Sequence, residues 1–184
     1  ATLRPYQHDG VAWLSQMHRL GVGRILADDM GLGKTLMALT LLAKAKLKDG
    51  PRPSLVVAPT SVLDVWVDEA RRHVPDLTVR KWHGRDRADK SKKGLEADIV
   101  VTSYALLRRD LAELKGVKFR CVVLDEAQNI KNADSATAQA SKSLTAETRL
   151  ALTGTPLENR LGELWSLFDF LMPGFLGSSD DFHD

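Results

Sequence analysis

Short continuous runs of apolar residues, separated by longer segments of helical periodicity, constrain the fold of this chain most strongly. Most of the runs are not interrupted by polar residues, which is typical of strands that are buried on both faces. We predict strands within the segments 23–29, 54–59, 77–84, 97–104, 119–127 and 148–155. We predict helices within the segments 4–21, 33–50, 61–74, 105–115, 134–144 and 163–172. This alternation predicts an α/β chain with a mostly parallel central sheet covered by helices on both faces.

Composition bounds the class of protein. The chain has 184 residues, of which 43% are hydrophobic and 27% charged, as expected of one globular domain with a core. Its single cysteine, Cys121, allows no disulfide within the chain and favours an intracellular, reducing location. No apolar run approaches the roughly 18 residues of a membrane span, and the net charge of +2 does not identify a nucleic-acid partner. Core packing is predicted for the tryptophans, namely Trp13, Trp66, Trp82 and Trp165.

The stretch "ILADDMGLGKT" connects the first predicted strand to the second predicted helix. It ends like the phosphate-binding pattern G-x-x-x-x-G-K-[ST], although Asp28 stands where that pattern has its first glycine. Ligands of parallel α/β sheets lie beyond the carboxyl ends of the strands, where this loop is expected. Gly31 and Gly33 would let backbone N–H groups point inward, Lys34 would reach the β- and γ-phosphates, and Thr35 would ligate Mg²⁺. The alternative is a glycine-rich turn before a helix.

A pair of acids, Asp125 and Glu126, follows the apolar run of "CVVLDEAQ". An Asp at the end of a strand can hold Mg²⁺, partly through water, and an adjacent Glu can orient or deprotonate an attacking water. The alternative is a solvated strand end. Together with the loop, the pair predicts a site for a nucleoside triphosphate and Mg²⁺, with Lys34 as the third catalytic residue.

Three longer motifs resemble those of the Swi/Snf-type ATPases, which are helicase-like DNA translocases of superfamily two: "DDMGLGKT", "DEAQNIKN" and "LTGTPLENRLGELWSLFDFLMPG". The resemblance runs from "LRPYQ" to "FLMPGFLG" and implies a three-layer α/β/α, RecA-like P-loop domain. It implies that residues 1–184 form the N-terminal ATPase lobe, of the bacterial type. The family tolerates Asp at position 28. The loop residues implied to contact the nucleotide are Asp28, Asp29, Met30, Gly31, Leu32 and Gly33.

The same resemblance assigns roles to polar residues outside the loop. Gln7 corresponds to a glutamine that recognises adenine, which implies ATP; the alternative is a surface glutamine on a helix. Gln128 stands where many family members have histidine, and it keeps the capacity for hydrogen bonding near the nucleotide. Thr153, Gly154 and Thr155 of "LTGTP" are implied to couple the ATP site to the DNA face, with hydrogen bonds near Gln128; the alternative is a plain strand-to-turn transition.

Hydroxyl residues after two predicted strands are similar to the motifs that track DNA. They are Thr60, Ser61, Thr102 and Ser103. Hydroxyls and helix N-terminal amides suit contacts with backbone phosphates. The alternative is helix capping, for which Ser61 has capping-box spacing with Asp64.

The resemblance implies a DNA-dependent ATPase that moves along double-stranded DNA. A second RecA-like lobe would complete the ATP site with arginines from a Q-x-x-G-R-x-x-R run, which this sequence lacks. We therefore expect the lobe alone to hydrolyse ATP poorly. The alternatives are a lobe of a strand-separating helicase and a non-catalytic nucleotide- or DNA-binding module. The "DEAQ" form favours a prokaryotic cell, with the protein in the cytoplasm or nucleoid.

Overall fold

The computed structural model describes residues 3–19, 23–27, 33–49, 52–84, 95–154 and 161–177. They contain one six-stranded sheet in which every strand pair is parallel, with the order β1-β6-β5-β2-β4-β3. The strands are β1 (Arg24–Ala27), β2 (Ser54–Ala58), β3 (Val79–Lys81), β4 (Ile99–Ser103), β5 (Lys118–Leu124) and β6 (Thr145–Thr153). The predicted fold class is confirmed.

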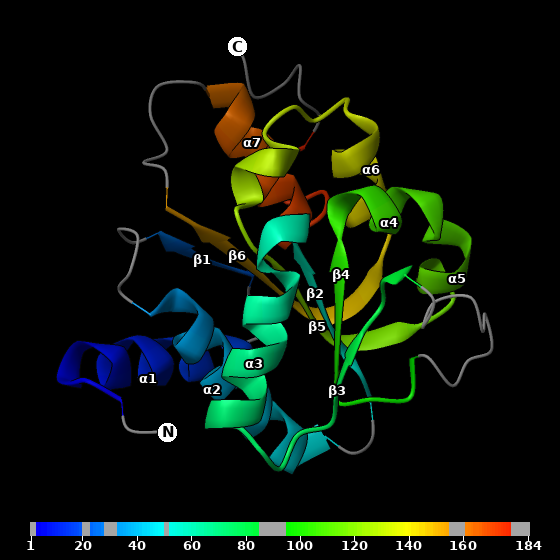
Figure 1. The fold of residues 1–184 in the computed structure, drawn as a ribbon. Helices are drawn as coiled ribbons and strands as arrows, with labels where there is room; N and C mark the ends of the chain where they lie inside the picture. Colours follow the sequence, from blue (N-terminus) through cyan, green and yellow to red (C-terminus); the bar gives the residue numbers. More distant parts are fainter. Residues whose placement is uncertain are drawn as a thin grey trace.

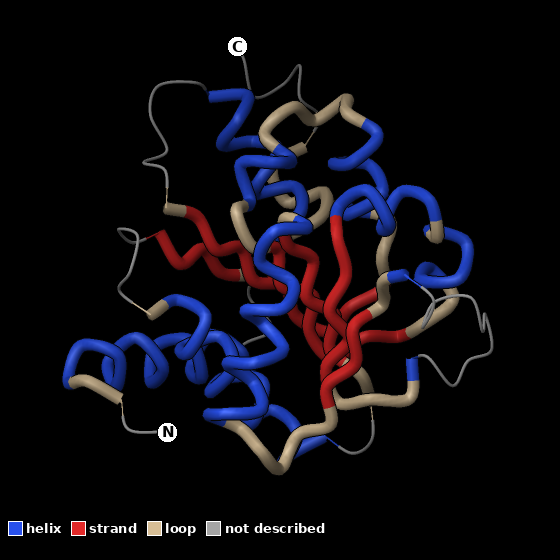
Figure 2. Tube along the Cα trace, in the orientation of Figure 1, coloured by secondary structure: helices blue, strands red, loops and turns tan. Residues whose placement is uncertain are grey.

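Helices cover both faces of the sheet, which forms the middle of three layers (Figures 1 and 2). One face carries α1 (Pro5–Arg19), α2 (Lys34–Asp49) and α3 (Leu63–His73), and the other carries α4 (Tyr104–Arg109), α5 (Leu111–Lys115), α6 (Ala136–Lys142) and α7 (Leu161–Leu171). Every residue of β2 and β4 is buried. The unbroken apolar runs in the sequence therefore have their physical reason, since both faces of these strands are withdrawn from water.

The strands differ in length across the sheet. β1 has four residues and β3 has three, and these two strands form the sheet edges. β6 has nine residues and pairs with β5 on one side, whereas β1 covers only its carboxyl-terminal half, from Leu150 to Thr153. The ends of β1 and β6 that lead into the predicted site are thus in register.

Two helix predictions need correction. The segment 105–115 is not one helix, because α4 and α5 are separated at Asp110, which is buried and accepts a hydrogen bond from the Trp82 indole at 3.0 Å. The capping box of Ser61 is also wrong. Residues Thr60–Val62 form the short 3-10 helix η1, so α3 begins at Leu63 with Val62 as its N-cap and without a side-chain cap. A second 3-10 helix, η4 (Ala127–Ile130), was not predicted.

Cys121 is a free, buried thiol on β5, and burial raises the pKa of this thiol. Among the helices in the described ranges, none combines the length and the apolar character that a bilayer crossing needs.

Candidate functional site

Several residues of the predicted nucleotide site lie at or just after the carboxyl ends of three adjacent strands, β1, β6 and β5. The loop after β1 leads to Gly33, and α2 begins at Lys34. Asp125 and Glu126 follow β5, and Thr153 ends β6. The loop residues predicted to contact nucleotide at positions 28–32 lie outside the described residues, as does Thr155.

Gln7 lies against the last glycine of the loop. A Cβ atom on Gly33 would stand 2.2 Å from Gln7 Nε2, and Gly33 has a φ of 81°, which favours glycine. The Gln7 side chain is buried, and its Oε1 accepts a hydrogen bond from the Arg4 backbone N–H at 2.9 Å. The alternative of a surface glutamine is therefore wrong. Recognition of adenine by this amide stays a prediction.

Lys34 and Thr35 form the first turn of α2, a helix of 16 residues, and both side chains are partly buried. The positive end of such a helix attracts anions, and the Lys34 ammonium adds a full charge. Lys34 is close enough to Asp125 for its charge to favour the ionised carboxylate. The start of α2 and the acidic end of β5 therefore lie near enough for their charges to interact.

Asp125 is held through both its carboxylate oxygens. The Trp66 indole N–H donates to Oδ2 at 2.8 Å, and the Glu126 backbone N–H donates to Oδ1 at 3.0 Å. Burial raises the pKa of the Asp125 carboxyl; the Glu126 charge adds to the rise, whereas the Trp66 hydrogen bond and the Lys34 charge oppose it. A cation bound at this carboxylate would offset the unfavourable burial of its charge.

The main chain at Asp125 is held as well. Its N–H donates to the Val57 carbonyl of β2 at 2.8 Å, and its carbonyl accepts the Tyr104 hydroxyl at 2.6 Å. Burial and the charges of Asp125 and Glu126 raise the pKa of the Tyr104 phenol well above its usual value. The phenol therefore stays protonated and serves as the hydrogen-bond donor. Nothing in the sequence pattern indicates that Trp66 and Tyr104 lie at the site.

Glu126 has a φ of 50° and a ψ of 56°, in the left-handed region. It is the one non-glycine residue with positive φ in the part of the chain that the structure describes. Such a conformation costs on the order of 1–3 kcal/mol and persists where the surroundings enforce it. The Gln128 amide donates to Glu126 Oε2 at 2.6 Å, and Asn129 Nδ2 donates to the Glu126 carbonyl at 2.8 Å.

A chain of hydrogen bonds links Glu126 to the end of β6. The Thr153 hydroxyl donates to Gln128 Oε1 at 3.0 Å, and Gln128 in turn donates to Glu126. The expectation of hydrogen bonds near Gln128 therefore holds for Thr153, whereas Thr155 lies outside the described residues. Gly154 follows β6 as a partly buried bend. Transmission of a signal along this chain stays a prediction.

The donor set fits one magnesium ion shared with a nucleotide. In the described ranges, no group of three or more His, Cys, Asp or Glu side chains could hold a metal on its own. Mg²⁺ is usually bound by one or two carboxylates, phosphate oxygens and water, and not by an all-protein cage. Asp125 would provide the carboxylate, and Thr35 at the start of α2 would provide a hydroxyl on the side predicted to bind phosphate.

The four hydroxyls predicted to contact DNA differ in access. Thr60 and Ser61 are exposed in η1, directly after β2. Thr102 is fully buried, and its hydroxyl donates to the Trp82 carbonyl at 3.1 Å, so this conformation does not present it to a phosphate. Ser103 is buried and caps α4 by accepting the Leu106 N–H at 3.3 Å, as the capping alternative expects. Thr60 and Ser61 therefore remain the candidates for DNA contacts.

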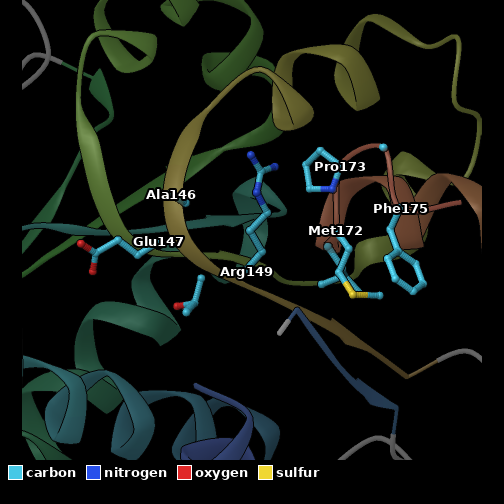
Figure 3. Close-up of a pocket in the computed structure, with 9 residues that line it drawn as sticks. Ala146, Glu147, Arg149, Met172, Pro173 and Phe175 are labelled. Atoms are coloured by element: carbon cyan, nitrogen blue, oxygen red, sulfur yellow. The ribbon is translucent and has the colours of Figure 1, made fainter. Parts of the chain in front are cut away.

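A pocket of about 500 Å³ lies elsewhere, at the amino-terminal half of β6. Figure 3 shows it between Ala146 and Glu147 on one side and Met172, Pro173 and Phe175 on the other. The guanidinium of Arg149 donates hydrogen bonds to carbonyl oxygens at and just after the end of α6, including that of Leu144 at 2.6 Å. None of the residues that line this pocket belongs to the predicted nucleotide site.

Comparisons with known proteins identify the family to which the chain belongs. The SNF2-related domain family matches residues 6–184. A Bacillus subtilis protein named putative ATP-dependent helicase/translocase YwqA is 46% identical over 99% of this chain and 20% of its own length. The Saccharomyces cerevisiae ISWI chromatin-remodeling complex ATPase ISW1 is 40% identical over 99% of this chain and 17% of its own length. The chain thus spans about a fifth of these relatives.

A solved structure of similar fold is the Sulfolobus solfataricus SWI2/SNF2 ATPase core in complex with double-stranded DNA. It superimposes with a TM-score of 0.91 and is 47% identical over 99% of this chain and 38% of that chain. Relatives of comparable identity therefore occur in bacteria, archaea and yeast. The bacterial type of the chain stays a prediction.

Proposed function

Because this chain belongs to the SNF2-related family, we propose that it is the nucleotide-binding lobe of an ATPase that moves along double-stranded DNA. The observation that carries the proposal is the meeting of four groups at the carboxyl edge of the sheet. These groups are the buried Gln7 amide, the start of α2 at Lys34, the carboxylate of Asp125 and the carboxylate of Glu126. The amide of Gln7 suits adenine, and the start of α2 at Lys34 suits phosphate. The carboxylate of Asp125 suits a metal ion, and that of Glu126 suits a water molecule.

Each group has a defined part in the proposed hydrolysis. The Gln7 amide recognises the adenine edge, and Lys34 with the N–H groups at the start of α2 binds the β- and γ-phosphates. Asp125 and Thr35 hold Mg²⁺, which neutralises charge on the phosphates when it is bound. Glu126 orients the attacking water and takes up its proton. The Gln128 amide, which donates to Glu126 Oε2, fixes the direction of that carboxylate.

Double-stranded DNA is the proposed polymer partner. The support is the archaeal relative, which was solved with double-stranded DNA, and the exposed hydroxyls of Thr60 and Ser61 in η1. These groups would contact backbone phosphates and carry no sequence preference. The protein would act inside the cell, where it meets DNA, and it would move along the duplex without separating the strands.

Weak hydrolysis by this lobe alone is part of the proposal. The sequence contains no Q-x-x-G-R-x-x-R run, and the chain covers 38% of the archaeal ATPase core. Arginines that reach the γ-phosphate can accelerate hydrolysis by about 10³ to 10⁵. We propose that a second RecA-like lobe supplies them.

The deciding experiment measures Mg²⁺-dependent nucleotide binding and ATP hydrolysis by the chain, with and without duplex DNA. We expect binding that is lost in Lys34→Ala and kept in Glu126→Gln, with slow or no turnover. Absence of Mg²⁺-dependent binding would refute the proposed nucleotide site. DNA-stimulated turnover that Glu126→Gln abolishes would show that the residues of this lobe suffice, against the expectation of weak hydrolysis. Strand displacement by the whole protein would favour a helicase over a translocase.

A further inference from the structure

Asp125 is held by aromatic side chains from two different helices. Trp66 lies in the first turns of α3 and is 1% exposed, and its indole N–H reaches Asp125 Oδ2. Tyr104 is the first residue of α4 and is 8% exposed, and its hydroxyl reaches the Asp125 carbonyl. The two helices cover opposite faces of the sheet. The acid is therefore approached from both outer layers of the domain.

The two contacts act on different parts of the same residue. The indole N–H fixes the direction of the carboxylate, because it donates to Oδ2 while the Glu126 N–H donates to Oδ1. The phenol fixes the main chain, because its hydroxyl donates to the Asp125 carbonyl. This carbonyl belongs to the peptide group that precedes the left-handed residue Glu126. A carboxylate in which both oxygens accept hydrogen bonds loses little freedom when it binds a metal ion, and outer-shell partners of this kind commonly tune metal affinity.

We propose that Trp66 and Tyr104 are positioning residues that orient Asp125 for Mg²⁺, Trp66 through the carboxylate and Tyr104 through the main chain. This inference rests on the proposed function of the site. Neither side chain touches nucleotide or water in this role. Their effect on nucleotide binding is confined to the part that depends on the metal.

A matched pair elsewhere in the chain separates positioning from packing. The Trp82 indole N–H donates to Asp110 Oδ2 at 3.0 Å, and Trp82 is 2% exposed. Burial and hydrogen bonding thus resemble those of the pair formed by Trp66 and Asp125. Asp110 lies between α4 and α5 and does not belong to the nucleotide site. Trp82→Phe therefore reproduces the structural loss of Trp66→Phe without touching the predicted metal ligand.

The test measures the affinity of a fluorescent ADP analogue with Mg²⁺ and with EDTA. The ratio of the two affinities is compared for the wild type, Trp66→Phe, Tyr104→Phe and Trp82→Phe. We expect Trp66→Phe to lower this ratio about tenfold, as for loss of an outer-shell partner. Tyr104→Phe should lower it by a smaller factor, and Trp82→Phe should keep it within about twofold of the wild type. Equal ratios in all four proteins, with similar losses of Tm in both Trp variants, would overturn the inference.

A second measurement does not depend on the variants folding. In a nitrogen-labelled wild-type chain, the Trp66 indole N–H resonance should shift when Mg²⁺ and ADP are added together, but not with ADP and EDTA. The Trp82 resonance is the internal control and should not move. A Trp66 resonance that ignores the metal overturns the inference. A wild-type chain without Mg²⁺-dependent binding refutes the proposed function as well, whereas wild-type binding with an unchanged Trp66→Phe ratio refutes this inference alone.

Discussion

At the scale of single residues, the backbone conformation and close neighbours restrict which amino acids the candidate site can accept. Gly33 cannot carry a Cβ, because that atom would stand 2.2 Å from Gln7 Nε2. Glu126 keeps a left-handed conformation that Gln128 and Asn129 enclose with hydrogen bonds. The first case places α1 against Gly33, directly before α2, and the second turns the chain directly after the predicted metal ligand.

Gly33→Ala is expected to abolish nucleotide binding. The substitution combines an unfavourable positive φ with displacement of the Gln7 amide, and we expect a loss of more than about 1 kcal/mol in unfolding free energy. Gly174→Ala is the matched control, because Gly174 has a φ of 77° and nothing within 4 Å of an added Cβ. It shares the conformational cost and should bind nucleotide normally. Equal binding by both variants would contradict the contact between Gly33 and Gln7. Binding titrations and urea unfolding provide the two measurements.

Glu126→Gly and Glu126→Ala should both lose ATP hydrolysis, in the whole protein if the lobe alone is inactive. They should differ in stability. Both delete the carboxylate, but only alanine pays for a φ of 50°, so the glycine variant should be more stable by about 1 kcal/mol. Urea unfolding of the pair measures this difference. An alanine variant as stable as the glycine variant would show that Glu126 is not left-handed in solution.

At the scale of elements, the predictable part of the fold was the part with local causes. The strands β2 and β4 coincide with continuous apolar runs, since burial on both faces leaves that pattern in the sequence. The break between α4 and α5 was missed because its cause is distant: Trp82, before the helix and far from Asp110 in sequence, provides the hydrogen bond that Asp110 accepts.

The same reason explains what was missed at the site. Trp66 is a core residue by its periodicity, and the core prediction holds for it. Its hydrogen bond to Asp125 requires β2, which leads to α3, to lie beside β5, which leads to Asp125. The order of strands in the sheet cannot be deduced from apolar patterns. Trp13 shows the opposite error, because it lies on an apolar-looking helix yet is 45% exposed. Gln7 was placed at the site only by family resemblance.

Asp98 ties three elements together and provides a pH-dependent prediction. Its carboxylate accepts hydrogen bonds from Lys46 of α2 and from the N–H and hydroxyl of Thr78, next to β3. Burial alone would raise the pKa of Asp98, but the hydrogen bonds from Lys46 and Thr78 outweigh it and lower the pKa. A lowered pKa in the folded state stabilises the protein above the unfolded value, near pH 4, and this stabilisation is lost as the pH falls through the folded value.

Asp98→Asn should therefore reduce the unfolding free energy by about 1 kcal/mol at pH 7 and by progressively less below about pH 4. Asp68→Asn is the control, because Asp68 forms an exposed pair with Arg71 at 3.8 Å. It should change stability by less than about 0.5 kcal/mol at either pH. Denaturant unfolding of both variants and the wild type, at pH 7 and below about pH 4, measures these differences. A pH-independent loss in Asp98→Asn would mean that the charge of Asp98 is not what stabilises these elements.

At the scale of the whole molecule, the proposed nucleotide site draws on segments from both halves of the chain. Gln7 comes from the first helix, Lys34 from the second, and Asp125 and Thr153 from the ends of β5 and β6. The order of strands makes β1, β6 and β5 neighbours and so brings these segments together. A ligand that contacts all of them stabilises the entire domain and not one element, because unfolding of any segment would release it.

Nucleotide should therefore raise the Tm of the chain. At a nucleotide concentration of 100 times Kd, the folded state gains about 2.7 kcal/mol, which corresponds to about 5 to 10 °C for a domain of this size. Removal of Mg²⁺ with EDTA should diminish the shift, and Lys34→Ala should eliminate it. Thermal unfolding followed by circular dichroism measures all three. A shift that survives in Lys34→Ala would place the ligand at some other surface.

The pairing of β1 with β6 has a consequence for synthesis on the ribosome. About 125 residues separate Arg24 from its partner Leu150, and β1 has no other partner strand in the described sheet. At about 5 to 20 residues per second, the ribosome needs about 6 to 25 s to make that intervening chain. The strand β1 emerges first but cannot be anchored in the sheet until β6 has left the exit tunnel. The part of the nascent chain that has emerged is thus exposed to chaperones and proteases throughout this interval, and the proposed nucleotide site cannot form before β6 has emerged.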